Sequence, residues 1–88
     1  MPLQKVAIFL MMIGTEKGQR ILTLMDNGEI KAVMSELRKL KEVSRETQES
    51  IWAEFSTLGY EDQMKPPEIL TVIRFLFNGR RISDMRGD

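Results

Sequence analysis

Apolar residues recur along most of the chain at intervals of three and four, which is the spacing of one face of an amphipathic helix. The clearest stripe begins at Ile30 and runs through Val33, Met34 and Leu37 to Leu40, with charged residues on the other faces. No run alternates apolar and polar positions as a half-buried strand does. The pattern predicts an all-α domain, a bundle of about five short helices with orthogonal or right-handed superhelical packing.

Glycine and capping residues predict where the first two helices lie. Gly14 is placed to end a helix over residues 3–13, because glycine readily takes the backbone conformation that closes a helix. Thr15 can cap a second helix that continues to Leu24, with Glu16 favoured in its first turn by the helix dipole.

Asp26 is the strongest capping signal in the chain. Its carboxylate can accept a hydrogen bond from the next turn while Glu29, three residues on, reaches back to its amide. A third helix is expected to follow, and Ser44 begins a fourth that ends at Gly59.

The last predicted helix covers residues 68–77 after the Pro66-Pro67 pair, and apolar residues surround most of its circumference. It is either buried by its own domain or leaves apolar surface for an interface, and the sequence leaves both open. We place one helical domain over residues 1–79 and expect the polar residues 80–88 to form a frayed or disordered tail.

Composition narrows the class of protein. With 88 residues, 42% hydrophobic and 30% charged, the chain fits one small globular domain, and its formal net charge of zero gives no overall field for a polyanion. The absence of cysteine is consistent with a reducing compartment.

The longest apolar run, Val6 to Ile13, has eight residues, whereas a membrane-spanning helix needs about 20, so we expect no membrane insertion. No small-x-small cleavage site follows it, which argues against a secretory signal.

The sequence contains few of the residue types and motifs that catalysis uses. Histidine and cysteine are absent, and no serine or threonine lies in a nucleophile motif. The adjacent carboxylates Glu61 and Asp62 fit a solvated connector better than an acid pair, and the order Lys17-Gly18 does not match a phosphate-binding loop. We predict no enzymatic activity, no cofactor, no metal site and no small-molecule substrate.

A basic cluster supports the main rival class, a small nucleic-acid-binding helical domain. Its phosphate contacts would come from Arg38, Lys39, Lys41 and Arg45, together with Arg80, Arg81 and Arg86 in the tail. Glutamates interrupt the cluster, however, and favour a solvated, ion-paired face. A regulatory helical module is a further alternative, although the clustered acidic residues that metal use would need are missing from the sequence.

Seven methionines are many for this length. Met11, Met12, Met25 and Met34 fall at core-like positions, where thioethers fill irregular gaps. Methionine-lined surfaces also repack around partner helices at low cost, so an adaptable groove is the second interpretation.

Two segments of the chain have a distinctive order of helices and junctions. In the first, Lys5 leads an aliphatic run to Gly14, and a junction of the Leu-x-Asp-x-x-Glu type follows at residues 24–29. The second, VSRETQESIWAEF, is a capped helix that ends in Glu-Phe at Phe55. Together they resemble the amino-terminal domain of the flagellar rotor switch protein FliG. After Phe55 the sequence departs from that pattern, because a proline pair and a very apolar helix replace the family's charged helix.

The resemblance implies a small helical domain that binds carboxy-terminal helices of the MS-ring protein FliF and packs against neighbouring copies in a cytoplasmic ring, without catalysis. We therefore expect a non-enzymatic protein–protein assembly module, held at the cytoplasmic face of the inner membrane through its partner. An excised domain and a short relative that keeps only the assembly module both remain open. The residues expected to bind the partner helix or a second copy are Phe9, Met12, Ile69, Ile73, Leu76 and Phe77.

Overall fold

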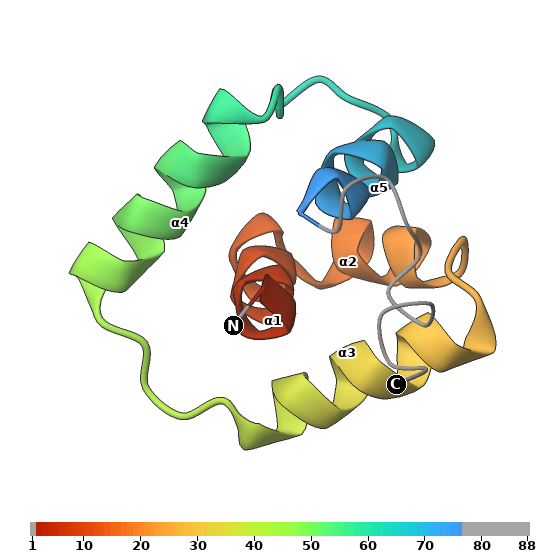
Figure 1. Ribbon diagram of the computed structural model, residues 1–88, viewed down its shortest axis with the longest axis horizontal. Coiled ribbons are helices and arrows are strands. Elements are labelled where there is room, and N and C mark those ends of the chain that lie inside the picture. The colour runs from red at the N-terminus through yellow and green to blue at the C-terminus, as the bar shows by residue number, and fades with distance from the viewer. Residues whose placement is uncertain (1, 77–88) are drawn as a thin grey trace.

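The computed structural model describes residues 2–76, and within this range it contains five helices and no strand (Figure 1). In chain order they are α1 (Pro2–Ile13), α2 (Thr15–Leu22), α3 (Asn27–Lys39), α4 (Arg45–Thr57) and α5 (Pro66–Phe75). The all-α prediction is therefore confirmed. The predicted domain end at residue 79 and the predicted tail over 80–88 lie outside the described residues.

Helix α1 is the axis around which the other helices are arranged. Figure 1 shows it nearly end-on in the middle of the domain, with α4 on one side, α3 on another, and α2 and α5 on the side opposite α4. Its main contacts are with α2, α3 and α4. Five consecutive residues from Val6 to Leu10 are buried, which requires cover on all sides of the helix. The longest apolar run of the sequence is thus a central core helix.

The junction before α3 has the predicted capping box. The Asp26 carboxylate accepts from the Glu29 backbone amide at 2.8 Å, and the Glu29 carboxylate accepts from the Asp26 amide at 3.1 Å. Ser44 likewise caps α4, since its Oγ accepts from the Thr47 amide at 3.1 Å. Gly59, at φ 112°, lies just past the end of α4 in a conformation that favours glycine.

The start and end of α2 differ from the prediction. Thr15 is the first helical residue, and Gly14 occupies the N-cap position at φ 99° without a side-chain hydrogen bond. Because α1 ends at Ile13, one glycine both closes α1 and opens α2, and no residue remains for a separate threonine cap. The helix also ends at Leu22, since Leu24 already lies in the turn before Asp26.

The last helix begins earlier than predicted. Pro66 and Pro67 form its first turn, where a missing amide hydrogen costs no hydrogen bond. The Glu68 carboxylate accepts from the Lys65 backbone amide at 3.1 Å and so stabilises this start. The helix ends at Phe75, whereas the predicted end at Phe77 lies outside the described residues.

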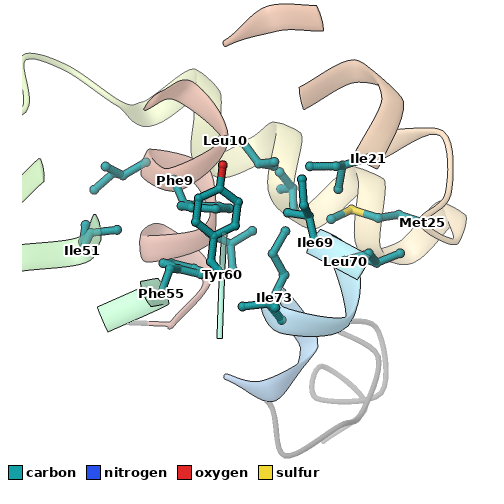
Figure 2. Close-up of a cluster of buried hydrophobic side chains, with 14 of the residues drawn as sticks. Phe9, Leu10, Ile21, Met25, Ile51, Phe55, Tyr60, Ile69, Leu70 and Ile73 are labelled. Carbon is teal, nitrogen blue, oxygen red and sulfur yellow. The ribbon is translucent and has the colours of Figure 1, made fainter. Parts of the chain in front are cut away.

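The hydrophobic core joins α1 to α4 through stacked aromatic rings and to α5 through aliphatic side chains (Figure 2). The ring of Phe9 stacks on that of Phe55 with centroids 4.0 Å apart, and Tyr60 meets Phe9 edge-on at 5.0 Å. Trp52 completes the cluster, 5.2 Å from Tyr60. Four residues of α5 are buried in the same core: Ile69, Leu70, Val72 and Ile73.

Candidate partner-binding surface

The structure separates the residues that were expected to bind a partner into two groups. Phe9, Ile69 and Ile73 are fully buried, so none of them offers surface to a partner while the helices are packed. Met12 and Leu76 are partly buried and lie against the core from outside. Phe77 lies outside the described residues. Partner binding by any of them stays a prediction, but only the second group can act without a change in the fold.

An apolar groove of about 330 Å³ lies where α1, α2 and α3 meet. Its apolar wall consists of Leu10, Met11, Leu22, Met34 and Leu37, and its remaining lining residues are Gly14, Thr15, Gly18 and Gln19. We call these residues the α1–α3 groove. Met11 is its most open apolar side chain, with 43% of its surface exposed. The sequence placed Met11 in the core, whereas the structure places it at the mouth of the groove.

The local sequence explains how the groove forms. The single-residue break at Gly14 turns α2 sharply away from α1 and leaves Leu10 and Met11 beside the first turns of α2. Gly18 is buried where α2 lies against α1, and a Cβ at this position would make an ordinary contact, 3.5 Å from the carbonyl oxygen of Leu10. On the far side, α3 supplies Met34 and Leu37 from the apolar stripe seen in the sequence.

A second groove, of about 320 Å³, lies on the other side of α1 against α4. Met12 lines it together with Trp52 and Ala53, and its polar residues are Arg45, Gln48 and Glu49. Successive residues of a helix point about 100° apart, so Met11 and Met12 serve different grooves. The two methionine-lined surfaces agree with the adaptable-groove interpretation of the sequence.

Two ion pairs lie on the exposed surfaces of α2 and α3. Arg20 and Glu16 form an ion pair of 3.0 Å on the exposed side of α2. Lys39, a member of the basic cluster, pairs with Glu36 at 3.4 Å. These exposed pairs support the solvated-face interpretation of the charges on α2 and α3.

Within residues 2–76, one ion pair has a fully buried carboxylate, and no pattern in the sequence indicated this pair. Glu29 is fully buried, and its Oε1 accepts from Arg74 Nη2 at 2.8 Å while its Oε2 accepts from Arg74 Nε at 3.3 Å. The pair joins the first turn of α3 to the last turn of α5, across 45 residues of sequence. The capping box predicted only the local hydrogen bond between Glu29 and the Asp26 amide, because no sequence pattern indicates the distant partner Arg74.

The remaining polar groups of residues 2–76 were compared for metal-ligand clusters and for buried atoms without partners. No group of three or more potential metal-binding side chains occurs in this part of the chain, and no buried side-chain nitrogen or oxygen lacks a hydrogen-bond partner there. Burial raises the pKa of the Tyr60 phenol, and the nearby Asp62 carboxylate raises it further.

None of the helices in residues 2–76 combines the length and the apolar character needed to span a bilayer.

The family model of the FliG N-terminal domain matches residues 1–78 of the chain. The match includes α5, although the sequence pattern after Phe55 had suggested a departure from that family. Searches among characterised proteins and among solved structures gave no significant match.

Proposed function

Because the chain belongs to the FliG N-terminal domain family, we propose that it is an assembly module whose α1–α3 groove accepts an apolar helix of a partner protein. The family is one of flagellar motor switch assembly domains and not of enzymes. The partner proposed here is the carboxy-terminal helix of an MS-ring protein of the FliF type. Docking to that protein would hold the module at the cytoplasmic face of the inner membrane.

The observation that carries the proposal is the half-exposed Met11 at the mouth of an otherwise apolar groove. A partner helix laid along the groove would cover Met11 and reach Leu22 and Leu37, which are only partly buried by their own domain. Each aliphatic side chain that the partner buries contributes about 1.5 to 3 kcal/mol, before the cost of association is subtracted. The flexible thioethers of Met11 and Met34 can adjust to the shape of the incoming side chains.

The buried candidates have a supporting role in this proposal. Phe9 lies on the helix that carries Met11 and fixes that helix in the core, and Ile69 and Ile73 hold α5 against the same core. Met12 faces the second groove, which we propose as the contact with a neighbouring copy of the module, because it lies away from the partner-helix site. The two contacts could then exist at the same time in a ring.

The test compares two variants with the same chemical change at two exposed apolar positions. Met11→Asp places a carboxylate in the groove, whereas Leu24→Asp places it at a residue that is 45% exposed and lies outside the groove. Titration calorimetry with the carboxy-terminal segment of FliF from the same organism should show a loss of about 30-fold or more for Met11→Asp, since an apolar contact becomes a buried charge.

The Leu24→Asp variant should bind within about threefold of the unchanged chain. Equal losses in both variants would contradict the groove as the binding site, and the absence of binding by the unchanged chain would contradict the proposed partner. Circular dichroism should show the same helicity in both variants as in the unchanged chain. A variant that keeps its helicity has lost a binding contact and not its fold.

A further inference from the structure

We propose that two copies of the domain pair face to face at the amino-terminal end of α1, where a basic stripe on α3 of each copy meets an acidic stripe on α4 of the other. The occupant of this surface is therefore a second copy of the chain. The contact uses neither of the two methionine-lined grooves, so it goes beyond the proposed function and does not depend on it.

Each stripe consists of two like charges with a serine midway between them. On α3 the residues are Lys31, Ser35 and Lys39, and on α4 they are Glu46, Ser50 and Glu54. Residues that follow one another at intervals of four lie on one side of a helix, and the two charges of each stripe are about 12 Å apart along the axis. The stripes thus have equal spacing and opposite charge.

Both stripes line hollows that border the first two turns of α1. The basic hollow, of about 270 Å³, is lined by Leu3, Lys31, Ala32, Ser35, Glu36 and Lys39. The acidic hollow, of about 400 Å³, includes the whole α4 stripe together with Gln4, Lys5 and Ile8 of α1. Because α1 stands between α3 and α4 (Figure 1), the two hollows lie on different sides of the same helix end. One surface of the domain therefore carries both stripes.

The charges that line the two hollows are inverses of each other. The basic hollow has two lysines and one glutamate, and the acidic hollow has two glutamates and one lysine. In the basic hollow, Glu36 pairs with Lys39 at 3.4 Å. In the acidic hollow, Lys5 pairs with Glu54 at 3.0 Å. Each hollow therefore neutralises one charge of its own stripe.

The other charge of each stripe has no such pair. Lys31 and Glu46 are exposed, and neither takes part in an ion pair within residues 2–76. Each copy thus offers one uncompensated positive charge and one uncompensated negative charge on the same surface.

A two-fold rotation brings both charges to a partner at once. When a second copy faces the first about an axis through the end of α1, each basic stripe lies opposite an acidic stripe. Self-complementary contacts of this form are the commonest in homo-oligomers. Complementary charges guide the encounter and fix its register, but exposed ion pairs are individually weak and are screened by salt. The pairing should therefore be weak, concentration-dependent and sensitive to salt.

Carbodiimide crosslinking tests the contact on the unchanged chain, because the reagent joins a lysine amine to a carboxylate where the two groups already touch. Equal amounts of ¹⁵N-labelled and unlabelled chain are mixed, and mass spectrometry identifies crosslinked peptides that contain both isotopes. Links between chains should connect Lys31 or Lys39 to Glu46 or Glu54. Their yield should fall at least about threefold when the salt concentration rises from about 0.1 M to about 1 M.

The chain supplies its own controls for this reaction. The pair of Lys5 and Glu54 should give a link within one chain, which shows that the reagent has acted. Lys17 and Lys65 are exposed and line neither hollow, so they should give at least about tenfold fewer links between chains than Lys31. Links between chains that are spread evenly over the exposed lysines would overturn the proposal.

Charge reversal with rescue separates the contact from other associations. One variant carries Lys31→Glu with Lys39→Glu, and the other carries Glu46→Lys with Glu54→Lys. All four side chains are exposed or partly exposed, and circular dichroism should show unchanged helicity. In sedimentation equilibrium each variant alone should have an association constant at least about fivefold below that of the unchanged chain, because like charges then face each other.

An equal mixture of the two variants should recover the association, because opposite charges face each other again. Its mass should approach that of a dimer and stop there. Variants that associate alone as well as the unchanged chain does, or a mixture that remains monomeric, would overturn the proposal. Masses that rise beyond the dimer would overturn its two-fold form.

Discussion

Truncation of Phe9 distinguishes a core residue from an interface residue at the centre of the fold. The side chain is fully buried, stacked on Phe55 at 4.0 Å and in edge contact with Tyr60 at 5.0 Å. Phe→Ala changes at buried positions cost about 3 to 5 kcal/mol. A domain of this size has a total unfolding free energy of about 4 to 13 kcal/mol, at roughly 0.05 to 0.15 kcal/mol per residue. Phe9→Ala therefore removes a large share of that free energy.

The expected result is a large fall in the melting temperature. A loss of 1 kcal/mol lowers the midpoint of a small domain by about 4 to 8 °C, so Phe9→Ala should lower it by about 12 to 40 °C or leave the chain unfolded. Thermal unfolding followed by far-UV circular dichroism measures the helices, and the fluorescence of Trp52, 6.0 Å from Phe9, reports on the aromatic cluster.

Leu24→Ala is the matched control, because Leu24 is apolar but 45% exposed, and its melting temperature should change by no more than a few degrees. A Phe9→Ala variant that melts within about 3 °C of the unchanged protein would refute the assignment of Phe9 to the core.

Three further predictions concern a helix interior, a cap and a titrating group. Gly18→Ala should raise the free energy of unfolding, measured in a urea titration, by about 0.5 to 1 kcal/mol, since the added methyl group meets only an ordinary contact within a helix. Gly14→Ala should lower the free energy of unfolding by about 1 to 3 kcal/mol, because φ at this position is 99°, which strains any residue other than glycine. Asp26→Ala should lower it by about 0.5 to 2 kcal/mol, because α3 loses its cap; a loss within error would contradict the capping box. Burial and Asp62 raise the pKa of Tyr60, so over a range of alkaline pH the folded state keeps the phenol proton that the unfolded chain releases. The contribution of Tyr60 to the free energy of unfolding is therefore complete below about pH 10, and it is lost as the pH rises through the pKa of the folded state. Tyr60→Phe should abolish that part of the alkaline fall in the melting temperature, and an identical fall in both proteins would contradict it.

Local signals in the sequence were sufficient for most of the fold. The Asp26 cap, the Ser44 cap and the glycine at position 59 act over a few residues, and each appears in the structure where the sequence placed it. The errors at α2 and α5 are also local: Gly14 serves two helices at once, and Pro66 is accepted in a first turn. Helix limits depend on such competition between neighbouring signals, which residue preferences alone do not decide.

The candidate site was less predictable, because burial depends on three-dimensional packing. The sequence could show that apolar residues surround most of α5, but not that Ile69 and Ile73 face inward while Phe75 remains half-exposed. It also could not separate Met11 from Met12, which are adjacent in the chain and line grooves on different sides of α1. The abundance of methionine was the one signal that indicated an adaptable surface.

The buried Glu29–Arg74 pair shows that an ion pair between distant parts of the chain is equally hard to predict from the sequence. Both residues have ordinary local explanations, since one belongs to a capping box and the other is a basic residue in the last turn of a helix. Their contact joins positions 45 residues apart and follows from the return of α5 to the start of α3. No spacing rule in the sequence predicts such a contact.

The most direct test of the central claim is the affinity of the chain for the carboxy-terminal segment of FliF, measured by titration calorimetry for the Met11→Asp variant and the Leu24→Asp control. The α1–α3 groove as the binding site predicts that Met11→Asp weakens binding by about 30-fold or more while Leu24→Asp stays within about threefold of the unchanged chain. Binding of Met11→Asp with unchanged affinity would contradict that claim.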